Sequence, residues 1–465
     1  MERLQSYRFE LMPNGRQRRA MQSFAGACRY VFNKALDIQK ARYEGGDKRL
    51  GYAALCKLLT GWRHDKDTRW LLQAPTHPLQ QSLKNLEQAY ANFFAGRADF
   101  PSFKKKGRQD SFRYPDPQQI RIEQGNDRIF LPKLGWLRYR NSRQVLGAVR
   151  NVTVSLHAGR WFMAIQTARE VAPVVASGEA VGVDMGIVRF ATLSDGDYEE
   201  PINSFKRHEA RLRKAQQALS RKVKHSRNWT KATKRVQRIH ARIGNARKDY
   251  LHKVTRAICN NHAIVYIEDL RVKQLSKSAA GSQSEPGRGV RAKSGLNKAI
   301  LDQGWYEFRR QLAYKLAWKG GSLVAVLAHH TSQTCPGCGH VSPDNRRTQA
   351  KFACVACGYE NNADVVGAIN VLRRGEAMIR SEGRDDARLA CVVNGVVMPS
   401  TAGTLRSGLC QPTAGSGAAG IPSFPRKRRP EAEVGEDVKC TGRDAPGAMG
   451  RGVDIPRTRS AFRLA

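Results

Sequence analysis

Two closely spaced cysteine pairs constrain this sequence more than any other feature. The pairs are Cys335-Pro336-Gly337-Cys338 and Cys354-Val355-Ala356-Cys357, and fifteen residues separate them. Each pair can supply two thiolates from a tight turn, and a hairpin between the pairs would bring all four sulfurs to one Zn²⁺. Because every ligand is a cysteine, the sequence predicts a closed, structural zinc site formed by Cys335, Cys338, Cys354 and Cys357. Two disulfides or free thiols are the competing interpretation.

The charge of the chain indicates a polyanionic partner. There are 80 Lys and Arg residues against 40 Asp and Glu, which gives a formal net charge of +40. A folded core needs no such excess, and nucleic acid is the default partner at this charge. A basic surface of the ribosomal-protein kind and a membrane-surface protein are the alternatives. The sequence shows no apolar stretch near the roughly 20 residues that span a bilayer and no secretion signal, so we expect a cytoplasmic protein with reduced cysteines.

The N-terminal half combines strand and helix patterns. Residues 6–11 alternate apolar and polar side chains, a helical pattern begins near Arg16, and a second one covers residues 79–94. Residues 119–170 are typical of short strands in a β-barrel. Between these regions, residues 100–106 interleave aromatic and basic side chains, which suits either a segment lying along a phosphate backbone or a solvated loop.

A second unit is predicted from Ala180 onward. Its first strand ends at Asp184, and a later buried strand, residues 263–267, ends at Glu268. Between them, residues 206–259 are helical and rich in Lys and Arg, with a break near residues 225–228. Such a pair of helices can follow nucleic acid or can simply present a solvated face. After the cysteines, Asp364 opens a last helix.

Three acids in this unit form a candidate catalytic centre. Asp184, Glu268 and Asp364 occupy a strand, a strand end and a helix start, in an order that fits an RNase H-like core where the first and fourth strands are neighbours. Such a cluster repels itself unless cations bind, and Mg²⁺ prefers carboxylate oxygens and water. Two ions could activate a water and stabilise the leaving oxygen of a phosphodiester. Ordinary structural roles for the three acids remain the alternative, and we expect the neighbouring Asp269 to act in capping or support.

The motifs together resemble one known family. Their order is Asp184-Met185-Gly186, Glu268-Asp269-Leu270, Thr331-Ser332-Gln333-Thr334-Cys335, the second cysteine pair and Asn362-Ala363-Asp364. Upstream, Cys28-Arg29-Tyr30-Val31-Phe32-Asn33 and Pro101-Ser102-Phe103-Lys104-Lys105-Lys106 agree as well. This pattern resembles TnpB, the OrfB protein of bacterial insertion sequences, over residues 6–374.

The resemblance implies an RNA-guided DNA endonuclease of a transposable element. Its partners would be a guide RNA from the end of the element and double-stranded target DNA with a short adjacent motif. Asp184, Glu268 and Asp364 match the catalytic acids of the family, which bind Mg²⁺, and the four cysteines match its zinc module. Base pairing would then supply sequence specificity, and the basic protein would supply the channel. When it is bound to DNA, the protein would be associated with the nucleoid.

The resemblance also implies a multidomain α+β architecture. A wedge-like β-barrel would take residues 1–13 and 97–175, with a helical recognition domain inserted at residues 14–96. A RuvC-like nuclease domain would take residues 180–331 and 362–374, with the basic helical pair at residues 206–259 and a zinc ribbon inserted at residues 332–361. Residues 375–465, poor in aromatic side chains, are predicted to be a disordered basic tail.

The sequence departs from the family pattern at Val366, where a polar residue is usual. This puts hydrogen bonds that support the acids in doubt and leaves a catalytically weak or inactive RNA-guided repressor, or a regulator of transposition, as the alternative function. A transposase that itself joins strands is a third hypothesis. The sequence shows no His-hydrophobe-His motif with a partner Tyr for a covalent DNA link, which argues against it.

Overall fold

Alternating apolar side chains in the N-terminal half build one antiparallel sheet of seven strands. The computed structural model describes residues 2–382 except residues 175 and 283, and it shows a mixed α+β protein. In spatial order the strands are β2 (Ser111–Tyr114), β6 (Ala148–His157), β7 (Arg160–Glu170), β1 (Glu2–Met12), β5 (Gly135–Tyr139), β4 (Arg128–Leu131) and β3 (Arg121–Glu123).

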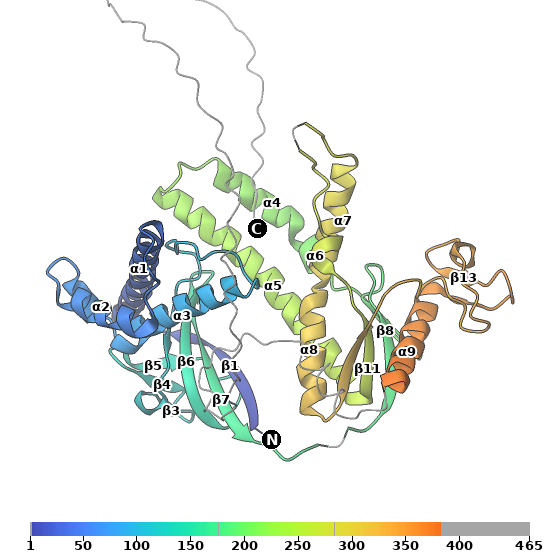
Figure 1. Ribbon diagram of the computed structural model, residues 1–465, viewed down its shortest axis with the longest axis horizontal. Coiled ribbons are helices and arrows are strands. Elements are labelled where there is room, and N and C mark those ends of the chain that lie inside the picture. Colours follow the sequence, from blue (N-terminus) through green and yellow to red (C-terminus); the bar gives the residue numbers. More distant parts are fainter. Residues whose placement is uncertain (1, 175, 283, 383–465) are drawn as a thin grey trace, which may run out of the picture. The chain divides into compact units, whose positions relative to one another are not determined.

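Strand β1 joins the two halves of this sheet (Figure 1). It pairs with β7 from Glu2 to Glu10 and with β5 at Leu11 and Met12. Tyr7, Phe9 and Leu11 alternate into the core, as the period of two in a strand requires. The edge strands β2 and β3 are not paired with each other in the described part of the chain.

Three helices pack in the same region. They are α1 (Gly15–Glu44), α2 (Tyr52–His64) and α3 (Thr76–Phe94), with short 3₁₀ turns η1 (Arg69–Gln73) and η2 (Pro117–Gln119). Helix α1 begins with a capping box, because the Asn14 side chain accepts the Gln17 amide and the Gln17 side chain accepts the Asn14 amide. The sequence patterns predicted α1 and α3 but missed α2, whose buried Leu55, Leu59 and Trp62 have helical spacing.

A five-stranded mixed sheet forms the second part. Its order is β10 (Tyr198–Glu199), β9 (Ala191–Leu193), β8 (Glu179–Asp184), β11 (His262–Glu268) and β12 (Ser322–Val326). Strands β8, β11 and β12 are parallel, and β9 and β10 are added as antiparallel strands. The first and fourth strands in chain order, β8 and β11, are therefore neighbours.

The basic segment after β10 forms two helices. They are α4 (Ser204–Ser220) and α5 (Arg227–Asn261), and the break between them falls where the sequence indicated it. Ser226 caps α5 by accepting the Trp229 amide. Toward its end, α5 packs Leu251, Val254 and Ile258 into the core of the second sheet. The chain continues through α6 (Val272–Leu275), α7 (Val290–Gln303) and α8 (Trp305–Trp318).

The last described elements are a small module and helix α9. The module contains η3 (Pro343–Arg346) and the hairpin of β13 (Lys351–Ala353) and β14 (Glu360–Asn362). None of the helices in the described residues is long and apolar enough to cross a membrane.

Helix α9 corrects one prediction. It spans Ala363–Glu382, so the prediction of disorder from residue 375 is wrong for residues 375–382. Met378 and Ile379 continue the apolar face of α9 against Tyr266, Val324 and Val326. Because glycine disfavours helix, the sequence predicted that the last helix ends before Gly375. In the structure the helix continues, and the absence of a side chain at Gly375 leaves room for the ring of Tyr266. The rest of the predicted tail, residues 383–465, lies outside the described residues.

Candidate functional site

Asp184 is the last residue of β8, and its side chain lies beside the first turns of α9. Gly182, two residues earlier, lets the helix approach, because a Cβ at this position would lie 2.1 Å from the carbonyl oxygen of Ala368. A Cβ on Gly367 would lie 3.3 Å from the carboxyl carbon of Asp184. Two glycines thus bring the backbone of α9 against β8 and set Asp184 beside the first turns of that helix.

Glu268 is the last residue of the neighbouring strand β11. Ile267 is in register with Val183, so the next positions along the two parallel strands carry Glu268 and Asp184. Glu268 is only 7% exposed, and its Oε1 accepts a hydrogen bond of 2.8 Å from the hydroxyl of Thr331. A buried carboxylate needs such a donor, because an unpaired charge is costly away from water.

Asp364 is the second residue of α9, so an acidic group sits in the first turn, where the helix dipole favours it. Its amide donates to the side chain of Asn362. Its Oδ1 accepts a hydrogen bond of 3.1 Å from Nη2 of Arg346, which ends η3 in the small module. The third acid is therefore held by a residue from a segment that the sequence assigned to the zinc module.

The other two acids act electrostatically on Asp184. Burial, and then repulsion by Glu268 and Asp364, raise the pKa of Asp184 to about 7, although Arg346 opposes this shift. Burial also raises the pKa of Glu268, and the Thr331 hydroxyl and the charges of Arg374 and Arg346 counteract it. A cluster with these properties favours bound protons or cations.

The three carboxylates lie farther from one another than the four cysteine sulfurs do. Among residues 2–382 as described, the four cysteines are the one group of three or more candidate ligands whose ligand atoms converge within 4.8 Å. Like charges repel one another, and Arg346 forms an ion pair with Asp364. The neighbouring Asp269 turns away to Arg309 of α8, with Nη1 and Oδ1 2.5 Å apart.

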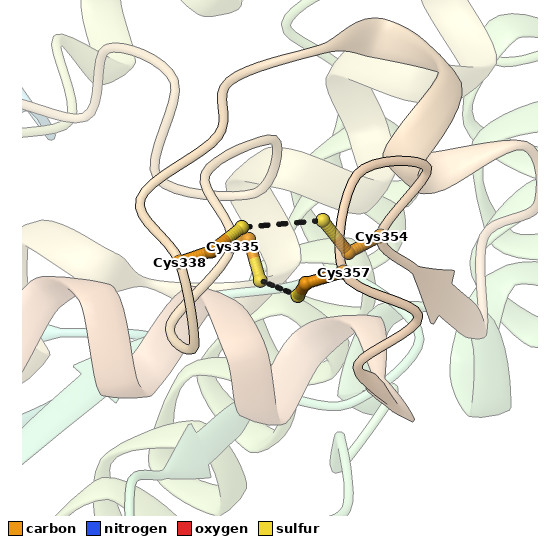
Figure 2. A group of neighbouring side chains, drawn as sticks. All are labelled: Cys335, Cys338, Cys354 and Cys357. Atoms are coloured by element: carbon orange, nitrogen blue, oxygen red, sulfur yellow. Dashed lines mark hydrogen bonds between the residues drawn. The ribbon is translucent and has the colours of Figure 1, made fainter.

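The four cysteines form a compact tetrad (Figure 2). The Sγ atoms of Cys335 and Cys357 are 3.6 Å apart, as are those of Cys338 and Cys354. A tetrahedral Zn²⁺ with bonds of about 2.3 Å would have sulfurs about 3.8 Å apart, so the tetrad fits zinc and not two disulfides. Gly339 and Gly358 have positive φ angles just past each pair, where the chain reverses, and His340 is exposed.

The tetrad is joined to α9 by packing and hydrogen bonds. Val366 is fully buried in a cluster with Phe352, Cys335 and Cys354, which explains an apolar side chain at this position. Asn370 donates to the carbonyl oxygens of Thr331 and Thr334, both at 2.7 Å. Arg373 donates to the carbonyl oxygen of Pro336.

Three residues that contact the acids or the loop beside them could not be identified from the sequence as part of the candidate site. Thr331 was noted only as part of a motif, and no pattern marked Arg346 or Arg374. Arg374 donates to the carbonyl oxygens of Leu327 and His329, on the loop that carries Thr331. These contacts depend on how the loop after β12 folds over α9, which periodicity does not reveal.

Family models match three parts of the chain. Two describe the OrfB family, one as "Probable transposase" over residues 153–279 and one as "Helix-turn-helix domain" over residues 1–48. A third, "Cas12f1-like, TNB domain", matches residues 305–371, which include all four cysteines. Residues 2–48 contain β1 and α1, and α2 begins only at Tyr52, so the described part of that match holds no helix-turn-helix.

Individual proteins are similar over most of the chain. "Putative RNA-guided DNA endonuclease InsQ" of Escherichia coli (strain K12) is 55% identical over 82% of this chain and 94% of its own length. A "Putative RNA-guided DNA endonuclease" of Streptomyces pristinaespiralis is 33% identical over 80% of this chain and 89% of its own length. A solved Cas12f1–sgRNA–target DNA complex covers 75% of this chain and 81% of that chain at 12% identity, with a TM-score of 0.47.

Proposed function

The chain belongs to the TnpB (OrfB) family of insertion-sequence proteins, and on that premise we propose that it is an RNA-guided DNA endonuclease of a transposable element. The observation that carries this proposal is the placement of Asp184, Glu268 and Asp364 at the ends of β8 and β11 and the start of α9. There Glu268 and Asp364 oppose the ionisation of Asp184, and a four-cysteine tetrad packs nearby.

The order of the second sheet supports an RNase H-like, RuvC-type nuclease domain over residues 180–331 and 362–382. Its first and fourth strands are adjacent, and α9 crosses them next to the acids. Residues 332–361 would be the inserted zinc ribbon. Residues 1–13 and 97–175 would form the wedge, and residues 14–96 the helical recognition domain. These boundaries are proposals from the resemblance and the element order.

The residues of the site fit hydrolysis assisted by Mg²⁺. Asp184, Glu268 and Asp364 offer hard carboxylate oxygens, the ligands that Mg²⁺ prefers, and their mutual repulsion would be relieved by cations. When bound, two such ions would lower the pKa of an attacking water and stabilise the leaving oxygen of the phosphodiester. The hydrogen bond from Thr331 orients Glu268, and the hydrogen bond from Arg346 partly neutralises the charge of Asp364.

The cysteine tetrad would hold a structural Zn²⁺. All four ligand positions are filled by Cys335, Cys338, Cys354 and Cys357, which leaves no open position for substrate. Through Val366 and Asn370 the zinc module would fix the start of α9 and the loop that carries Thr331. Zinc would therefore support the catalytic acids without taking part in the reaction.

Guide RNA and target DNA would be the partners. The net charge of +40 suits a protein that follows phosphate backbones while base pairing reads the sequence. On this proposal the guide derives from the end of the element, and the target is double-stranded DNA with a short adjacent motif.

One experiment tests the function and the site together. The protein is copurified with its RNA, the RNA is sequenced, and DNA matching its variable end is offered with Mg²⁺. We expect cutting that requires the matching RNA and is abolished in Asp184→Ala, Glu268→Ala and Asp364→Ala, while RNA and target binding persist.

Retained cutting in all three variants would refute the site. Stable binding of RNA and target by the wild-type protein, with the DNA left intact, would instead support an RNA-guided repressor or regulator of transposition.

A further inference from the structure

An open groove of about 730 Å³ lies along one face of α1, far in sequence from the carboxylates. Its floor is a helical stripe that includes Gly26, Tyr30 and Asn33. Trp70 from η1 and Phe103 from the loop before β2 line it as well. Its volume falls within the roughly 300–1,000 Å³ that is usual for ligand sites.

The aromatic side chains of the groove are available for stacking. Trp70 is 39% exposed and Phe103 is 41% exposed, although both are large apolar groups. Tyr30 packs edge-on against Trp70, with ring centroids 5.2 Å apart and planes at 68°. This T-shaped contact fixes the orientation of the indole, and the exposed part of its surface can serve as a platform for a flat ligand.

The loop that carries Phe103 is held in place before any ligand binds. The Asn33 side chain donates to the carbonyl oxygen of Lys104 at 3.0 Å and accepts the Lys104 amide at 2.8 Å. The Lys104 ammonium lies 4.0 Å above the ring of Phe32, and Lys40 lies 4.6 Å from the centroid of Phe103. Fixing both rings in advance lowers the entropy cost of binding.

The segment that supplies Phe103 is strongly basic, which favours a polyanion as the ligand. Residues 97–108 carry Arg97, Lys104, Lys105, Lys106 and Arg108 against the single acid Asp99. Lys34 also lines the groove, with its ammonium 4.9 Å from the ring of Trp62. Aromatic platforms flanked by cations are the arrangement that binds single-stranded nucleic acid. A peptide partner would have to be both acidic and aromatic to match it.

Asp37 favours RNA over DNA as the occupant. It lines the groove, is exposed, and forms no ion pair with any described residue. A carboxylate repels phosphate, but it accepts a hydrogen bond from a 2′-hydroxyl, which DNA lacks. Ser23, farther along the same helix face, offers a second group for such contacts.

We propose that this groove binds unpaired nucleotides of the guide RNA, with their bases stacked on Trp70 and Phe103. The inference rests on the proposed function for the identity of the RNA. On this proposal, α1, η1 and the loop of residues 100–106 hold the RNA, and this role is separate from cleavage.

The test measures RNA affinity without cleavage. Full-length protein, freed of RNA and kept in EDTA, is titrated with RNA resynthesised from the sequence found in the purified complex, and separately with DNA of the same sequence. We expect Trp70→Ala and Phe103→Ala each to weaken RNA binding by roughly 5- to 100-fold, the range for loss of one base–aromatic stack. The dependence of affinity on salt should stay unchanged, because no phosphate contact is removed.

Matched variants separate stacking from folding. Trp70→Phe and Phe103→Tyr keep a ring and should bind RNA within about threefold of wild type, since an aromatic platform is retained. Tyr43→Ala removes an aromatic side chain that is 75% exposed on the same helix but outside the groove, and should have no effect. Photo-crosslinking with RNA that carries 4-thiouridine should label the peptides that contain Trp70 or Phe103.

Three results would overturn the inference. In the first, Trp70→Ala and Phe103→Ala bind RNA as tightly as wild type does. In the second, Tyr43→Ala loses as much RNA affinity as they do. In the third, Trp70→Ala and Phe103→Ala lose affinity only for the DNA of the same sequence, which would assign the groove to the target. If the wild-type protein binds no RNA at all, the proposed function fails first, so the two failures are distinguishable.

Discussion

Arg346 donates a hydrogen bond of 3.1 Å to Asp364, so the four-cysteine module reaches one of the three acids directly. Both side chains are about one-fifth exposed, and the contact joins η3 to the first turn of α9. An ion pair on a carboxylate that is proposed to bind Mg²⁺ competes with the metal. The geometry therefore links metal affinity to the position of the module.

Arg346→Gln should tighten Mg²⁺ binding. Because a partly exposed ion pair is worth about 1 kcal/mol or less, we expect the Mg²⁺ concentration that gives half of the maximal rise in Tm to fall by roughly two- to fivefold. Thermal shift without nucleic acid is the measurement, since it excludes any contact of Arg346 with substrate. Arg380→Gln, which breaks an exposed pair with Glu376, is the control. An unchanged or weaker Mg²⁺ response in Arg346→Gln would contradict the competition.

Thr331→Val should impair cleavage through Glu268. Thr331 is 4% exposed, and valine has nearly its shape but cannot donate to the carboxylate. A buried carboxylate left short of a donor costs about 1–3 kcal/mol, so both stability and the orientation of Glu268 should suffer. We expect at least a tenfold slower cleavage at saturating Mg²⁺, measured under single-turnover conditions.

Thr331→Ser supplies the matched control for this change. Serine keeps the hydroxyl and loses only a methyl group, so cleavage should recover to within a few-fold of wild type. If the valine and serine variants were equally slow, packing and not the hydrogen bond to Glu268 would account for the effect.

The sequence located the acids and cysteines on their elements because those positions follow from local patterns. Strand periodicity placed Asp184 and Glu268 at strand ends, and the Cys-x-x-Cys spacing predicted the tetrad. The chain is mixed α+β, as expected. The contacts that tune the acids could not be predicted, because Arg346 and Arg374 reach them through loops whose paths depend on tertiary packing.

Val366 and Gly375 show why local rules failed elsewhere. Val366 stands where the family usually has a polar residue, and it packs against the cysteine module, a contact that follows only from the folded arrangement. Gly375 was interpreted as the end of a helix. Its role is to admit the ring of Tyr266, which lies more than a hundred residues earlier in the chain.

Cys335→Ser or Cys357→Ser should lower zinc content and solubility together. Cys335 is buried in the cluster that holds Val366, so loss of the metal would loosen the start of α9 and displace Asp364. Zinc is measured by elemental analysis alongside Tm. Cys56→Ser, a cysteine outside the tetrad, should retain zinc. A well-folded, zinc-free variant that still cuts DNA would show that the module is dispensable.

Asp184 should make the metal-free protein less stable as pH rises. Its pKa is raised from 3.8 to about 7, so between these values the folded state holds a proton that the unfolded chain has released. Stability from this group is therefore full below about pH 4 and is lost by about pH 7, on the order of 4 kcal/mol at most.

The measurement for this prediction compares wild type with Asp184→Asn by urea unfolding in EDTA at several pH values. The stability of wild type relative to the variant should fall across that window, and Mg²⁺ should restore it at pH 8. A difference that is constant with pH would show that Asp184 ionises normally in the fold.

Gly182→Ala should disrupt the packing that brings α9 to the acids. The added methyl group would lie 2.1 Å from the carbonyl oxygen of Ala368 and 2.6 Å from the amide nitrogen of Leu372, and backbone atoms in a helix cannot turn aside. We expect a loss of about 3 kcal/mol or more in the free energy of unfolding, at the upper end for overpacking, with cleavage lost as Asp184 separates from Asp364. Gly244→Ala, inside α5 with no atom within 4 Å of the new Cβ, should instead stabilise by roughly 0.5–1 kcal/mol. Equal stability of the two variants would mean that α9 does not rest on β8 as closely as the structure shows.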